Sequence, residues 1–210
     1  MHEPVLLLIL VASYLMVVAK RVPALISSFR YQSFFLFLMT MISGFEERHP
    51  ALYLVAMLIL VLKVFVIPYV LNLIAKRINV DENLGLFVNA QLSLIIALLF
   101  TYCAWVFSGL IMFGQDYKLF AMTVAFSVIF TGAFLMIFRM KAFAQVAGLL
   151  VMENGVFLFA SFVLGGMPFF VEIAIFLDVF VSVIIMGLFV YRINKLFTHI
   201  DVNKLSRLKG

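Results

Sequence analysis

Seven long apolar segments dominate the 210-residue chain, and only short polar or basic stretches separate them. An α-helix needs about 20 apolar residues to cross the hydrocarbon core of a bilayer. Hydrophobic residues make up 66% and charged residues 12% of the chain, whereas soluble domains have about 45–50% and about 25%. The sequence therefore predicts an all-α, polytopic bundle of about seven transmembrane helices, which cover the following segments: Pro4–Ala19, Pro23–Gly44, Ala51–Ala75, Leu84–Phe107, Tyr117–Phe138, Ala142–Leu164 and Pro168–Tyr191.

The basic residues predict how this bundle is oriented. Lys and Arg concentrate in the cytoplasmic loops of polytopic membrane proteins. With seven spans, only Arg48 and Lys118 fall on one side of the membrane. The other side carries twelve basic residues: Lys20, Arg21, Arg30, Lys76, Arg77, Arg139, Lys141, Arg192, Lys195, Lys204, Arg207 and Lys209. We therefore expect the N-terminus outside and the C-terminus in the cytoplasm.

Several classes of site are missing from the sequence. A single cysteine, Cys103, excludes an internal disulfide and a cysteine-based metal cluster. There is no Gly-rich phosphate loop, no pair of histidines within the spans and no nucleophile–base constellation. We expect no cofactor, no metal site and no catalysis by this chain alone.

Ionisable residues inside the predicted spans are the candidate functional residues. Glu153 is the twelfth of 23 residues in its span, and Lys63 and Asp178 also lie near the centres of theirs. Such residues are costly to bury, so they mark proton or ion pathways by default. Burial disfavours the charged form of a carboxylate and a nearby cation favours it, so a balanced site can load and release a proton. Glu172 is either an outer step of this route or a residue that reaches the headgroups.

The polar side chains in the spans are expected to face protein. Lys63 should point into the bundle and pair with a carboxylate or line a polar route, since the interface is about 15 Å away. Glu153 and Asp178 lie at similar depth on consecutive antiparallel helices, so we expect them to face one another. The alternative for the carboxylates is a purely structural hydrogen bond, and the alternative for Lys63 is a long stem that reaches the interface. For three amide side chains, hydrogen bonding between helices is the favoured interpretation: Asn89, Gln91 and Asn154.

The segment Arg139–Leu158 resembles the second helix of the K-type subunit of respiratory complex I and of related antiporter and hydrogenase subunits. Here a basic loop leads into a Gly148-Leu149 pair, a glutamate and Asn154. The third family helix carries a second carboxylate before a basic end, and Asp178, fourteen residues before Arg192, occupies that place. The family glutamate directly follows the Gly-Leu pair, where this chain has Leu150. Its own glutamate comes three residues later, and the same helix face remains available to it.

With four additional helices, the whole chain resembles component E of hydrogenase-4-type complexes. This resemblance divides the chain into an N-terminal membrane extension (1–110), a three-helix region similar to the K-type subunit (111–196) and a basic cytoplasmic tail (197–210). It implies a non-redox subunit of a complex I-like membrane-bound [NiFe] hydrogenase or formate hydrogenlyase in the inner membrane. Its partners would be antiporter-like and H-type membrane subunits and, through them, a peripheral [NiFe] and iron–sulfur module. The proton or ion relay would consist of the following residues: Glu153, Asp178, Lys63 and Glu172.

Other functions remain open at the level of sequence. The chain is alternatively a subunit of a multisubunit cation/proton antiporter, or a structural adaptor whose polar residues only join helices. A stand-alone secondary transporter is disfavoured, because neither an internal repeat nor a pair of broken helices is visible. The electron donor and acceptor, the choice between proton and sodium, and the role of Glu153 in place of Leu150 are not determined by the sequence.

Overall fold

The computed structural model describes residues 2–48, 50–77, 89–111, 116–139 and 142–162. Within these ranges the chain forms helices and no strand. The elements are α1 (His2–Val18), α2 (Val22–Glu47), α3 (Pro50–Ile59), the π-helix η1 (Leu60–Val66), α4 (Ile67–Arg77), α5 (Ala90–Ile111), α6 (Asp116–Phe138) and α7 (Ala142–Phe162). α3, η1 and α4 follow one another without a break and form one long helix.

Five helices are long and apolar enough to cross a membrane: Val22–Glu46, Pro50–Leu73, Ala90–Ile111, Lys118–Phe138 and Phe143–Ser161. α1 is also apolar but shorter, at 17 residues. The chain is therefore an all-helical, multi-pass membrane protein. The expected seventh helix, Pro168–Tyr191, lies outside the described residues.

One predicted helix start was wrong. α5 begins at Ala90 rather than at Leu84, and it continues to Ile111 rather than ending at Phe107. Asn89 is not helical, and its carbonyl accepts the first hydrogen bond of α5 from the Ser93 N–H at 2.9 Å. Asparagine is among the residues preferred at such a helix start, whereas the apolar pattern by itself did not reveal this boundary.

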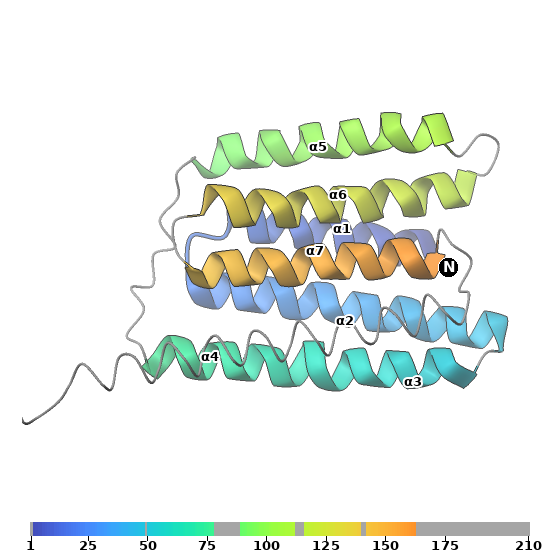
Figure 1. The fold of residues 1–210 in the computed structure, drawn as a ribbon, viewed down its shortest axis with the longest axis horizontal. Helices are drawn as coiled ribbons and strands as arrows, with labels where there is room; N and C mark the ends of the chain where they lie inside the picture. Colours follow the sequence, from blue (N-terminus) through green and yellow to red (C-terminus); the bar gives the residue numbers. More distant parts are fainter. Residues whose placement is uncertain (1, 49, 78–88, 112–115, 140–141, 163–210) are drawn as a thin grey trace, which may run out of the picture.

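The described helices lie side by side with their long axes roughly aligned (Figure 1). α6 and α7 pack most extensively, α1 contacts α2 and α6, and α2 contacts α7 and η1. α5 lies on one edge against α6 and α1, and the α3–η1–α4 helix lies on the other edge against α2. Four helices, α1, α2, α6 and α7, thus surround the interior in which the site is found.

Glycines allow α6 and α7 to approach closely. A Cβ at Gly132 would lie 2.5 Å from the Met152 nitrogen, and one at Gly148 would lie 2.7 Å from the Gly132 carbonyl oxygen. A Cβ at Gly155 would lie 2.8 Å from the Ile129 nitrogen. These approaches are possible only without side chains, as in other membrane helix pairs that pack through small residues. The contact aligns the Glu153 region of α7 with residues 129–132 of α6.

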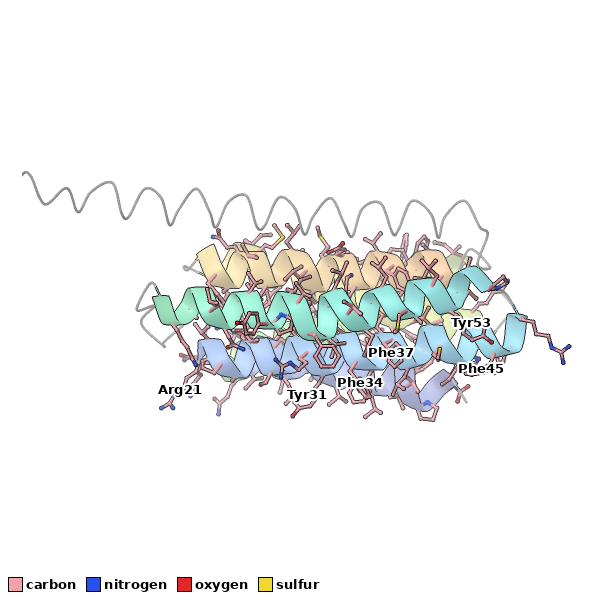
Figure 2. All side chains as sticks on the ribbon, turned by 90° about the horizontal axis from the view of Figure 1, so that it is seen from below. Arg21, Tyr31, Phe34, Phe37, Phe45 and Tyr53 are labelled. Atoms are coloured by element: carbon pink, nitrogen blue, oxygen red, sulfur yellow. The ribbon has the colours of Figure 1, made fainter. Side chains whose placement is uncertain are left out.

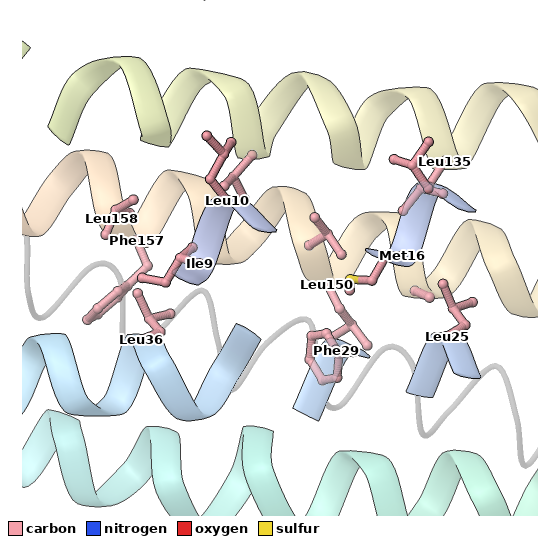
Figure 3. Close-up of a cluster of buried hydrophobic side chains, with 14 of the residues drawn as sticks. Ile9, Leu10, Met16, Leu25, Phe29, Leu36, Leu135, Leu150, Phe157 and Leu158 are labelled. Carbon is pink, nitrogen blue, oxygen red and sulfur yellow. The ribbon is translucent and has the colours of Figure 1, made fainter. Parts of the chain in front are cut away.

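Most buried side chains are apolar, and so is much of the outer surface. Buried side chains from α1, α2, α6 and α7 gather in one cluster (Figure 3), which includes Ile9, Met16, Phe29, Leu135 and Leu150. Outside, Tyr31 and Phe34 of α2 are exposed, and the Phe45 ring meets the Tyr53 ring edge-on at 5.3 Å (Figure 2). Apolar residues on all sides are typical of helices that contact lipid rather than water.

A buried arginine joins the ends of two helices. The Arg139 guanidinium donates to the carbonyls of Ala19 at 3.0 Å and Val17 at 2.5 Å, and Arg139 is only 2% exposed. The end of α6 therefore lies beside the end of α1, which is followed directly by Lys20 and Arg21. Basic residues from distant parts of the sequence thus lie at the same end of the bundle.

Candidate functional site

Lys63 lies in the middle of the long α3–η1–α4 helix, within the π-helical stretch. The Ile67 N–H donates to the carbonyl of Leu62, five residues earlier, which is the π-helical pattern. Pro68 follows immediately and has no N–H to donate to the carbonyl of Val64. The hydrogen bond that Pro68 cannot make therefore coincides with a stretch of π-helical hydrogen bonding just before it. Lys63 is 1% exposed and so points into the protein.

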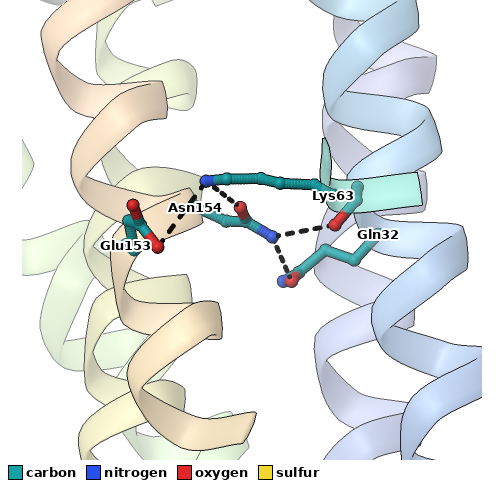
Figure 4. Close-up of polar contacts among 5 residues, drawn as sticks. Gln32, Lys63, Glu153 and Asn154 are labelled. Atoms are coloured by element: carbon teal, nitrogen blue, oxygen red, sulfur yellow. Dashed lines mark hydrogen bonds and ion pairs between the residues drawn. The ribbon is translucent and has the colours of Figure 1, made fainter. Parts of the chain in front are cut away.

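The Lys63 side chain reaches across the interior to α7 (Figure 4). Its Nζ donates a hydrogen bond to Asn154 Oδ1 at 2.8 Å and lies 3.9 Å from Glu153 Oε2. Glu153 is 6% exposed and Asn154 is 1% exposed. The expectation that Lys63 faces the bundle and lies near a carboxylate is confirmed, and that carboxylate is Glu153. Two residues separated by 90 positions thus form a buried ion pair.

A line of hydrogen bonds continues from this pair toward α1. Asn154 Nδ2 donates to Gln32 Oε1 at 3.0 Å and is 3.4 Å from Ser33 Oγ (Figure 4). Gln32 Nε2 donates to Ser13 Oγ at 2.7 Å, and Ser13 Oγ donates to the Ile9 carbonyl at 2.9 Å. Polar side chains from η1, α7, α2 and α1 are therefore connected through the centre of the bundle.

The arrangement supplies a titratable carboxylate beside an amine in apolar surroundings. Breaking a buried ion pair by removing one partner leaves a charge without compensation, which typically costs about 3–5 kcal/mol. The proton occupancy of Glu153 and the position of the Lys63 ammonium are consequently linked. The pair is connected through Asn154 to the hydrogen bonds of Gln32 and Ser13.

The structure describes two of the four predicted relay residues and brings them together. Asp178 and Glu172 lie outside the described residues, so the prediction that Asp178 faces Glu153 stays a prediction. Among the predicted amide contacts, Asn154 does bond across helices. Gln91, by contrast, is exposed near the start of α5.

The continuation of the hydrogen bonds through Gln32, Ser33 and Ser13 was not predicted from the sequence. All three are fully buried and lie near the centres of α1 and α2. The available signal was the adjacent pair Gln32-Ser33 inside an otherwise apolar span. Uncharged polar residues of this kind are frequent in membrane helices, so they stood out less than Lys63 and Glu153.

Leu150 and Glu153 lie on the same buried side of α7. Leu150 is 0% exposed and belongs to the apolar cluster, and Phe157, one heptad after Leu150, is 5% exposed (Figure 3). Residues three and seven positions apart share a helix face. Glu153 therefore lies on the face that a glutamate at position 150 would occupy. In the described part of the chain, no group of three or more His, Cys, Asp and Glu residues is arranged to hold a metal ion.

Two groups of proteins are similar to this chain over most of its length. The uncharacterized protein Rv0085 of Mycobacterium tuberculosis is 27% identical over 203 residues, which are 96% of this chain and 92% of that protein. Hydrogenase-4 component E of Escherichia coli K12 is 30% identical over 150 residues, which are 70% of this chain and 69% of that protein. Hydrogenase-4 component E of Shigella flexneri matches with the same identity and coverage. No protein-family model matches the chain, and no solved structure matches it.

Proposed function

The chain belongs to the hydrogenase-4 component E family, and we propose that it is a non-redox membrane subunit of a complex I-like, energy-converting oxidoreductase. The complex would be of the membrane-bound hydrogenase or formate hydrogenlyase type. The chain contributes buried ionisable groups to a proton or ion path and catalyses no reaction by itself. The buried Lys63–Glu153 pair is the observation that carries this proposal.

The surroundings of the pair support a role in transport. Nζ and Oε2 lie 3.9 Å apart, farther than in a hydrogen-bonded salt bridge, and both groups are buried near the middle of their helices. A pair whose only purpose was to join helices would gain most from direct contact. A longer separation lets each group change its partner when the charge of the other changes. The pair is therefore suited to pass on a proton.

The proposed route extends from this pair to the last helix. Asp178 provides the next titratable group, at a depth similar to that of Glu153, and Glu172 provides an outer step. Lys63 modulates the charge of Glu153 from the opposite side. Electron transfer elsewhere in the complex would shift these charges, and protons or cations would move in response.

The wider architecture follows from the family. We propose seven helices in the inner membrane, with the N-terminus outside and the C-terminus in the cytoplasm. Residues 1–110 form the membrane extension, 111–196 the region similar to the K-type subunit and 197–210 a basic cytoplasmic tail. The partners are antiporter-like and H-type membrane subunits, which connect the chain to a peripheral [NiFe] and iron–sulfur module.

Glu153→Gln in the native complex tests this function. Glutamine preserves the shape of the side chain, and Lys63 keeps its hydrogen bond to Asn154, so the complex should assemble in normal amounts. Because glutamine does not titrate, coupled ion translocation in membrane vesicles should fall by about tenfold or more, the usual contribution of a proton-transfer group being about 10²–10⁴. Translocation is measured against the electron-transfer rate of the same vesicles.

Glu3→Gln is the matched control, because Glu3 is an exposed carboxylate in the first turn of α1. It removes the same charge and should leave coupling unchanged. A second candidate function is a polar network that only joins helices. The cross-helix bonds of Asn154 are the observation in its support. Unchanged coupling in Glu153→Gln, combined with lower thermal stability, would establish that alternative.

A further inference from the structure

The ammonium group of Lys63 occupies the place beside Glu153 that a metal cation would need. Nζ is hydrogen-bonded to Asn154 Oδ1 at 2.8 Å and lies 3.9 Å from Glu153 Oε2. We propose that Lys63 is a built-in cation that excludes sodium and other metal ions from Glu153, so that the ion exchanged at this carboxylate is a proton. This inference rests on the proposed function and specifies its ion.

The oxygen atoms near Lys63 already accept hydrogen bonds from nitrogen. A lysine ammonium only donates, so it fixes Asn154 with Oδ1 toward Nζ and Nδ2 toward Gln32. This orientation in turn directs Gln32 Oε1 toward Asn154 and Gln32 Nε2 toward Ser13. Hard metal cations require several oxygen ligands at once. Here the side-chain oxygens of Asn154 and Gln32 already accept hydrogen bonds from N–H groups. The Lys63 ammonium determines which way each amide is turned.

Electrostatic repulsion acts in the same direction. A metal ion bound to Glu153 Oε2 would lie only a few ångströms from the Lys63 ammonium. Two unit charges about 4 Å apart, at an effective dielectric constant of about 20, repel strongly enough to weaken binding about a thousandfold. A positive charge in this position therefore opposes the binding of metal cations to Glu153.

A proton escapes the first constraint, the need for several oxygen ligands, whereas the Lys63 charge opposes protons and metal ions alike. A proton binds covalently to one carboxylate oxygen and needs no shell of ligands. When Glu153 is protonated, the Lys63 ammonium keeps its bond to Asn154. The site therefore keeps a polar contact for Lys63 in both protonation states of Glu153.

The native complex, reconstituted in proteoliposomes, tests the ion directly. Proton uptake is followed with an entrapped pH dye in sodium chloride and in choline chloride, and sodium uptake is followed with a radioactive tracer. We expect equal proton uptake in both salts, no coupled sodium uptake, and at least a tenfold loss of proton uptake in Glu153→Gln. Sodium uptake that disappears in Glu153→Gln would overturn the inference.

Removing the lysine should expose the excluded cation site. In the complex carrying Lys63→Ala, the cavity left by the side chain lies beside the Glu153 carboxylate. We expect sodium chloride, compared with choline chloride, to raise the melting temperature of this complex, and the added change Glu153→Gln to abolish the shift. Lys76→Ala, which removes an exposed lysine from the same long helix, is the control and should show no sodium effect. Absence of a sodium effect in Lys63→Ala would overturn the assignment of exclusion to Lys63.

The two proposals fail in different ways. If Glu153→Gln leaves all translocation intact, the proposed function is wrong and the inference about its ion is wrong with it. If Glu153→Gln abolishes a translocation that requires sodium, the function stands and only the exclusion by Lys63 is wrong. Should Lys63→Ala fail to assemble, the wild-type and Glu153→Gln measurements still decide the ion.

Discussion

Replacement of Gly148 by alanine is expected to destabilise the protein by about 3 kcal/mol, the upper part of the usual range for overpacking. A Cβ at this position would lie 2.7 Å from the Gly132 carbonyl oxygen and 2.8 Å from the Met136 nitrogen. Both are backbone atoms, so no change of rotamer relieves the clash and α6 must move away from α7. The measurement is the temperature at which the purified protein, in a mild detergent, loses its monodisperse peak on size exclusion.

Gly109→Ala provides a matched control in α5. A Cβ there meets only Leu119 Cδ1, at an ordinary 3.9 Å. Because alanine favours a helix over glycine by about 1 kcal/mol, this change should be neutral or slightly stabilising. The two glycine-to-alanine changes are thus expected to act in opposite directions. A similar melting temperature for both variants would show that the close approach of α6 and α7 is unimportant for stability.

The same contact gives a structural reason for the Gly148-Leu149 pair. In the sequence this pair indicated only a resemblance to the K-type subunit. In the structure Gly148 lies against Gly132, and this close approach aligns α6 with the part of α7 that carries Glu153 and Asn154. The glycine therefore contributes to the site through helix packing, and its loss should disturb coupling as well as stability.

The helices were largely predictable from the sequence because their apolar segments are long. The described residues of α6 and α7 fall within one residue of the predicted spans. The start of α5 was not predictable, because residues on both sides of Asn89 are apolar and hydropathy does not register a helix start within an apolar segment. The first backbone hydrogen bond of α5 runs from the Ser93 N–H to the Asn89 carbonyl.

The candidate site was predictable in its ionisable residues but not in its connections. Lys63 and Glu153 stood out because charges inside a membrane span are expensive. Their pairing depends on how the edge helix containing η1 lies relative to α7, which no local pattern in the sequence specifies. Gln32 and Ser13 were missed because a neutral polar side chain reveals its importance only when its partners are known. The hydrogen bonds to Asn154 and Ser13 supply those partners.

Arg139→Gln is expected to lower the free energy of unfolding by about 3 kcal/mol, because hydrogen bonds of a buried charged group are lost. The guanidinium is 2% exposed and donates to the carbonyl of Val17, in the last turn of α1, and to that of Ala19 just after the helix. Carbonyls at a helix end lack partners within the helix, and the negative end of the helix dipole favours a cation there. Burial lowers the pKa of Arg139 to about 10, so the side chain remains charged at neutral pH.

Two further variants separate the geometry of Arg139 from its charge. Arg139→Lys keeps the positive charge but replaces a planar fork with a single ammonium, so it should restore only part of the lost stability. Arg30→Gln removes a charge from an exposed position in α2 and should change the melting temperature little. Melting is followed by size exclusion after heating, at neutral pH and in the same detergent for all forms. Equal losses in Arg139→Gln and Arg30→Gln would mean that net charge, rather than the capping of α1 by Arg139, determines the stability of this end of the bundle.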